Sequence, residues 1–105
     1  MAKRTRNRKP TMPGEVLRHE FLEPADLTQT DLARHLGCDV KTINRLVNGH
    51  TRVTPKLARL LAAALGTTDR FWLNLQNAVD LFEAEQDIDE LPSRISPFDD
   101  QSARH

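Results

Sequence analysis

The chain has 105 residues, of which 38% are hydrophobic and 29% are charged, and its formal net charge is zero. A chain of this length suits one domain with a modest core, and these fractions are those of a soluble protein. No apolar run approaches the roughly 20 residues of a membrane span, and the basic N-terminus leads into no apolar signal core. A single cysteine excludes an intrachain disulfide. We therefore expect a cytoplasmic protein.

The zero net charge hides an uneven distribution along the chain. Residues 1–56 carry eleven Lys and Arg against six Asp and Glu, whereas residues 57–105 carry four against nine. A basic half of this kind is typical of a surface that faces DNA, although an uneven spread of ordinary surface charge is the plainer alternative. We expect residues 1–11 to form a flexible basic arm, which either lies along DNA or only makes the chain soluble.

A first helix is predicted from Pro13 to about Glu23. Proline is acceptable in the first turn of a helix, and Pro24 stops this one. The apolar positions that recur at helical spacing, and should face the core, are Val16, Leu17, Phe21 and Leu22.

Two short helices joined by a tight turn are predicted over residues 28–49, TQTDLARHLGCDVKTINRLVNG. Thr28 and Asp31 have the spacing of a capping box, and Gly37 can end the first helix in the left-handed conformation. Asp39 can cap the second helix. The apolar positions of that helix are Val40, Ile43, Leu46 and Val47, and the polar positions between them are Lys41, Thr42, Asn44 and Arg45. A helix with such an outer face is suited to the major groove of DNA.

Two further helices are predicted after this motif. Thr54 can cap the fourth, Pro55 suits its first turn and Gly66 ends it. Thr67 or Thr68 can cap the fifth, which we expect over about residues 68–86. The apolar surface of the fifth helix is broad for the last helix of a small bundle, so we infer that part of it packs on the core and part meets a second subunit.

The remainder, residues 87–105, is predicted to be an acidic and flexible tail. Pro92 and Pro97 interrupt any helix there, and its apolar residues are scattered rather than periodic. The tail could dock on a partner or stay loose, and the pattern leaves both open. Residues 12–86 then make up the single domain.

The two-helix motif resembles the helix-turn-helix of the Cro/repressor-like (XRE) family. The residues that carry this resemblance are Gln29, Ala33, Gly37, Ile43 and Asn48-Gly49. The wider chain, over roughly residues 12 to 82, is similar to HigA-type (VapI-like) antitoxins. The further segments that indicate this are Met12-Pro13-Gly14-Glu15 with Leu17, Pro24, Arg52-Val53-Thr54-Pro55 and Phe71-Trp72-Leu73-Asn74-Leu75-Gln76. The resemblance implies an all-α, five-helix lambda-repressor-like DNA-binding domain.

Sequence-specific DNA binding is the activity that this resemblance implies, with Gln29 on a phosphate. Arginine or lysine can donate to guanine, asparagine can pair with adenine, and valine can pack on a thymine methyl group. We therefore expect the bases to be read by Val40, Lys41, Asn44 and Arg45. The positions better placed for the DNA backbone are Thr42, Asn48, His50, Thr51 and Arg52. The plain alternative is that some of these side chains only solvate the helix.

We expect a homodimer, because one such unit covers only a few base pairs. A twofold dimer would place two recognition helices roughly 34 Å apart on a palindromic operator. The expected interface lies on the fifth helix, at Phe71, Trp72, Leu75, Val79 and Phe82.

The resemblance further implies the antitoxin and autorepressor of a type II toxin-antitoxin pair, which neutralises a small basic RelE-like ribonuclease toxin. The toxin could contact the N-terminal arm with the first helix, or the acidic tail, and the residues do not choose between them. The alternative function is a solitary XRE-family transcriptional regulator with no toxin partner.

Enzyme, metal and membrane roles find little support in the residues. His35 and Cys38 are the only close pair of soft metal ligands, and a structural zinc site needs four. No nucleophile paired with a base, glycine-rich phosphate loop or carboxylate pair is recognisable. The basic arm lacks the apolar face of a membrane-surface helix. We expect no catalysis, no cofactor, no metal and no membrane partner.

Overall fold

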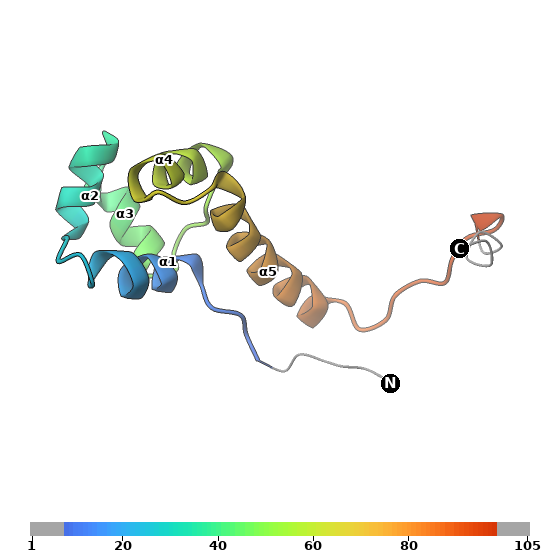
Figure 1. Cartoon of the computed structure of the whole chain (residues 1–105). Coiled ribbons are helices and arrows are strands. Elements are labelled where there is room, and N and C mark those ends of the chain that lie inside the picture. The colour runs from blue at the N-terminus through green and yellow to red at the C-terminus, as the bar shows by residue number, and fades with distance from the viewer. Residues whose placement is uncertain (1–7, 99–105) are drawn as a thin grey trace.

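The computed structural model describes residues 8–98. Its helices are α1 (Pro13–Val16), which continues directly as the π-helix η1 (Leu17–Leu22), α2 (Gln29–Leu36), α3 (Val40–Val47), α4 (Pro55–Leu65) and α5 (Asp69–Asp87) (Figure 1). No strand occurs between residues 8 and 98. With α1 and η1 counted as one continuous helix, the predicted all-α, five-helix fold is confirmed.

The first helix covers the predicted range but not with the expected geometry. Its second half is wound as a π-helix, in which the N–H of Glu23 donates to the carbonyl oxygen of Arg18 at 2.9 Å. Leu17 and Leu22 are buried all the same, and Phe21 is half-buried. Apolar spacing over six residues does not distinguish the two kinds of turn, so the sequence could not predict this one.

The turns of the motif form as predicted. The hydroxyl of Thr28 accepts from the N–H of Asp31 at 3.0 Å, while the Asp31 carboxylate accepts from the N–H of Thr28 at 3.1 Å, which completes the capping box. This backbone hydrogen bond lowers the pKa of Asp31. Gly37 ends α2 at a φ of 74°, and Asp39 caps α3 by accepting from the N–H of Lys41 at 3.0 Å. The angle between α2 and α3 is thus set by local hydrogen bonds.

The two threonines before α5 have different roles. The hydroxyl of Thr68 caps the helix by accepting from the N–H of Phe71 at 3.0 Å. The hydroxyl of Thr67 instead accepts from the indole N–H of Trp72 at 2.7 Å. The only N–H of that fully buried side chain is therefore satisfied, as buried polar groups generally are.

A single core joins all the helices. α1 packs against α3 and α5, α2 against α3 and α4, and α4 against α5. The aromatic rings of Phe21 and Phe71 lie 5.5 and 5.0 Å from Trp72 between ring centres. The largest side chains that are fully buried in the core are Leu17, Ile43, Leu46, Val53, Leu61 and Trp72.

Gly14 brings the first helix directly onto the backbone of α3. A methyl group at this position would overlap the carbonyl oxygen of Leu46 and lie 2.9 Å from the Cα of Val47. Only glycine allows so close an approach. The position of α3 therefore depends on a residue in α1 as well as on its neighbours in the motif.

The molecule is elongated, with principal extents of 54 × 25 × 21 Å. α5 extends beyond the other helices, and residues 88–98 continue from its end away from the helical body (Figure 1). Residues 1–7, most of the predicted basic arm, and residues 99–105, the end of the predicted tail, lie outside the described residues. Between residues 8 and 98, no helix is both long and apolar enough to cross a membrane.

Candidate nucleic-acid interface

The two sides of α3 differ in burial and polarity. Ile43 and Leu46 are 0% and 1% exposed and pack into the core, whereas Lys41 and Arg45 are exposed. Val40, predicted as part of the apolar pattern, is 41% exposed and lies on the outer side. A rigid helix with cationic side chains and one apolar side chain outside has the groups needed to contact base edges.

The first turn of α2 is tied to α3 by a chain of amides. The amide N–H of Asn48 donates to the Asn44 oxygen at 3.3 Å, and the Asn44 amide N–H donates to the Gln29 oxygen at 3.1 Å. Asn44 still has an unused N–H and an unused lone pair. Gln29 accepts with its oxygen, so its own NH₂ group is left for another partner. The three amides, predicted separately, form one polar surface.

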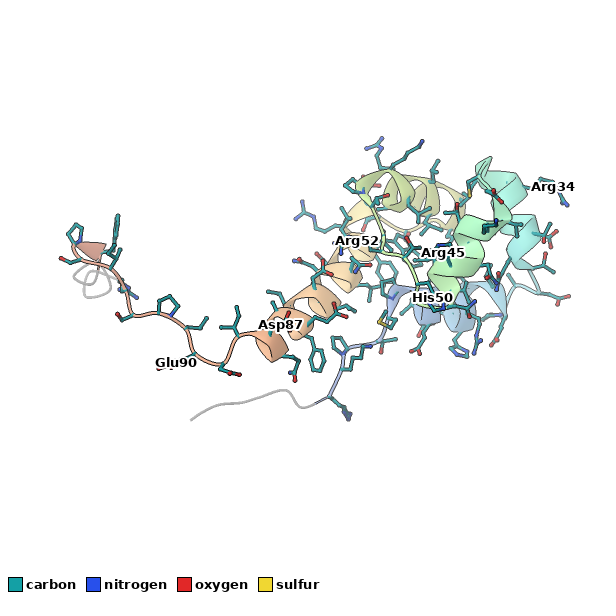
Figure 2. All side chains as sticks on the ribbon, turned by 180° about the vertical axis from the view of Figure 1, so that it is seen from behind. Arg34, Arg45, His50, Arg52, Asp87 and Glu90 are labelled. Carbon is teal, nitrogen blue, oxygen red and sulfur yellow. The ribbon has the colours of Figure 1, made fainter. Side chains whose placement is uncertain are left out.

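Arg45 lies over the loop that follows α3. Its guanidinium donates to the carbonyl oxygen of His50 at 3.3 Å, and both side chains are exposed (Figure 2). A surface hydrogen bond of this length is weak, since water competes for both groups. The hydrogen bond orients the Arg45 side chain but does not hold it in place, and the remaining donors of the guanidinium stay available.

Thr42 and Thr51 are less accessible than predicted. Both are half-buried, and they line a hollow of about 260 Å³ between α3 and the start of α4, with Cys38 and Lys56 also in its wall. Their hydroxyl groups therefore lie at the edge of the outer surface and not on its most exposed part.

Arg52 is held by an acid that the sequence reasoning missed. Its guanidinium makes two hydrogen bonds to Asp80 on α5, at 2.6 and 3.1 Å, which raise the pKa of Arg52 and lower that of Asp80. Gln76, 6% exposed, donates to Asp80 at 3.0 Å and accepts from the N–H of Val53 at 2.8 Å. This network, Arg52–Asp80–Gln76, fastens the loop after α3 to α5.

The predicted dimer residues of α5 do not share one environment. Trp72 and Val79 are 0% and 2% exposed within the single chain, so in this fold a second subunit cannot reach them. Leu75 packs half-buried against the core. Phe71 and Phe82 remain partly accessible. A residue that the prediction did not include, Leu81, is 58% exposed on the same helix.

The sequence could not show which side of α5 faces the core. A broad apolar stripe shows that a helix is covered over a wide arc, but it does not show which edge of the arc faces the core. Here the core takes Trp72 and Val79, and the free side of the helix carries Leu81 instead.

Comparisons with known proteins agree with this geometry. A family model for helix-turn-helix domains matches residues 19–73. The chain is 41% identical over 104 residues to antitoxin HigA-1 of Vibrio cholerae, covering 96% of this chain and 98% of that one. It is 44% identical over 81 residues to the HTH-type transcriptional regulator YbaQ of Escherichia coli K12, covering 77% and 72%. The solved structure of Pseudomonas aeruginosa antitoxin HigA with the higBA promoter superposes with a TM-score of 0.71 at 33% identity, covering 80% and 100%.

Proposed function

Because the chain belongs to the XRE-type helix-turn-helix family that includes the HigA antitoxins, we propose that it is a DNA-binding antitoxin that represses its own operon. This family is one of DNA-binding regulators and not a class of enzymes. The observation that carries the proposal is the outward face of α3, where Lys41 and Arg45 are exposed above a fully buried Ile43. It would act in the cytoplasm, where the operator is.

Base reading is assigned to the outer side of α3. Lys41 and Arg45 are the donors for guanine, Val40 packs on a thymine methyl group, and Asn44 reads adenine with its unused N–H and lone pair. Backbone contacts are assigned to the polar rim of this face, which consists of Gln29, Thr42, Asn48, His50 and Thr51. Arg52 belongs to this rim only in part, because Asp80 already neutralises it.

A homodimer completes the operator-binding unit. Two copies related by a twofold axis would present two α3 helices roughly 34 Å apart to a palindromic site. The free side of α5, with Phe71, Leu81 and Phe82, is the proposed contact. Residues 12–86 would then be the DNA-binding and dimerisation domain, with a basic arm before it and an acidic tail after it.

The toxin partner is proposed to be a small basic RelE-like ribonuclease. Support comes from the likeness to antitoxin HigA-1, which extends over 96% of the chain. The likeness to the regulator YbaQ favours the second candidate function, a solitary transcriptional regulator. Co-purification with the product of a neighbouring gene would distinguish the two, since a solitary regulator has no such partner.

Operator binding is tested by substituting the two outer cations of α3. We expect Lys41→Ala/Arg45→Ala to weaken binding to the promoter of the protein's own gene by about 1–3 kcal/mol for each lost base contact, with a smaller loss on random duplex. Fluorescence anisotropy with labelled duplexes measures both affinities.

A control that removes a single exposed cation remote from α3, Arg70→Ala on α5, should leave both affinities nearly unchanged. Equal losses on promoter and random duplex for the α3 variant would remove Lys41 and Arg45 from the base-reading set.

A further inference from the structure

Residues 87–98, here called the C-terminal arm, expose an unusual amount of apolar surface. Scattered exposed apolar side chains are normal in soluble proteins. Here four large ones follow within eleven residues: Ile88 at 49%, Leu91 at 75%, Ile95 at 70% and Phe98 at 57% exposed. They make up half of the large exposed apolar side chains between residues 8 and 98. Such a concentration marks a surface that is covered when the protein functions.

The C-terminal arm and the last turns of α5 are also strongly acidic. The acids are Glu83, Glu85, Asp87, Asp89 and Glu90, and no Lys or Arg occurs between Arg70 and Arg94. None of the five forms an ion pair with another described residue. Glu83 adds to the negative charge around Arg52, whereas no described cation pairs with the other four, whose charge is free to act on a partner.

DNA is excluded as the occupant of this surface by charge and by position. Phosphates would repel the five carboxylates. Asp87 and Glu90 lie on the part of the molecule that points away from Arg34, Arg45 and His50 (Figure 2). A protein bound to the C-terminal arm would thus leave the outer face of α3 free.

We infer that the C-terminal arm is the surface that docks the toxin, and that it does so by entering the basic groove with which that ribonuclease holds RNA. The inference rests on the proposed antitoxin function. An enzyme that cleaves RNA needs cationic side chains for the phosphates, so a chain of carboxylates is complementary to its groove. The exposed apolar residues add surface that would leave water on binding, which is favourable.

The dimensions and the sequence likeness support this assignment. Eleven extended residues reach up to about 36 Å, so the C-terminal arm can contact a partner well beyond the end of α5. The alignment with antitoxin HigA-1 covers 96% of this chain and therefore includes residues 88–98. A second copy of this chain is a poorer occupant of the C-terminal arm, because two arms packed together would place carboxylates against carboxylates.

The test uses the full chain and, as the probe, the purified product of the small open reading frame next to its gene. Two variants remove one property each: Leu91→Ser/Phe98→Ser removes apolar surface, and Asp87→Asn/Glu90→Gln removes charge. A matched control, Glu15→Gln/Glu20→Gln, makes the same charge change on the exposed side of the first helix. All six side chains are exposed, so each variant should retain the wild-type melting temperature.

We expect both arm variants to weaken probe binding at least tenfold in calorimetry and to restore RNA cleavage by the probe, with operator affinity unchanged. The charge variant should also show a weaker dependence of binding on salt. The control Glu15→Gln/Glu20→Gln should bind like wild type.

Four outcomes would overturn the inference. Wild-type affinity for the probe in both arm variants would place the toxin elsewhere while the antitoxin function stands. A lower mass in light scattering for the apolar variant would identify a second copy as the occupant, and a higher operator affinity for the charge variant would place the arm over the DNA face. If the wild-type chain does not bind the probe at all, the antitoxin function fails and this inference fails with it.

Discussion

Arg52 shows how an ion-pair partner changes what an exposed cation can bind. It stands in the loop after α3, where a free arginine would contact phosphates. Its two hydrogen bonds to Asp80 instead use the planar, bidentate geometry in which guanidinium and carboxylate pair best. At the scale of single residues, the network Arg52–Asp80–Gln76 is therefore a brace between the loop and α5, and we expect it to restrain non-specific attraction to DNA.

A double-mutant cycle tests this restraint. Arg52→Ala alone should change the affinity for random duplex only slightly, because its charge is already paired. In an Asp80→Ala background the same change should weaken binding several-fold and reduce the salt slope by about one, since the freed arginine would contact a phosphate. Anisotropy at several salt concentrations measures both effects. Equal effects of Arg52→Ala in the two backgrounds would show that Asp80 does not restrain it.

The same network predicts a dependence of stability on pH. The hydrogen bonds from Arg52 and Gln76 lower the pKa of Asp80 from its ordinary value of 3.8. Folding therefore favours the ionised carboxylate, and this stabilisation is present above pH 3.8 and is lost as the pH falls through the lower, folded pKa. In urea unfolding between pH 5 and pH 2, Asp80→Asn should lose less stability than wild type. An identical pH profile for the two proteins would contradict the assigned role.

At the scale of elements, α3 is positioned from two directions. The capping box and Gly37 set its angle to α2, while Gly14 lets α1 lie directly on its backbone. The two restraints are independent, since one is local in the chain and the other joins α1 to α3 across the fold. How far the outer face of α3 can move therefore depends on the packing between α1 and α3.

Gly14→Ala should disturb this packing. The added methyl group meets backbone atoms of Leu46 and Val47, which cannot rotate away, so one of the two helices must shift. We expect a loss of about 1–3 kcal/mol in the free energy of unfolding, together with weaker operator binding. Chemical denaturation and anisotropy measure the two, and Ala84→Ser, exposed on α5, serves as a neutral control. Unchanged stability would show that α1 can shift freely.

At the scale of the whole molecule, the proposed contacts are distributed along a 54 Å particle. The outer face of α3 is assigned to DNA, the free side of α5 to a second copy and the C-terminal arm to a toxin. These three surfaces do not overlap in their residues. Because the three surfaces are separate, we expect a toxin and the operator to be able to bind at the same time.

The dimer is tested on α5 by two contrasting substitutions. Leu81→Glu should halve the mass in light scattering at micromolar concentration and retain the melting temperature, because an unpaired carboxylate is costly only in the interface. Trp72→Glu should abolish cooperative unfolding, because its side chain is fully buried within the single chain. An unchanged mass for Leu81→Glu would exclude this side of α5 as the interface.

The sequence by itself determined where the helices lie, most of their caps and the outward direction of Lys41 and Arg45. Each of these depends on residues within about four positions of one another, where hydrogen bonding and helical spacing are local. Only the tertiary structure decided the pairing of Arg52 with Asp80, 28 positions away, and the burial of Trp72 and Val79 on the core side of α5. Such features depend on how helices pack against each other, and the period of an apolar stripe carries no information about the partner that covers it.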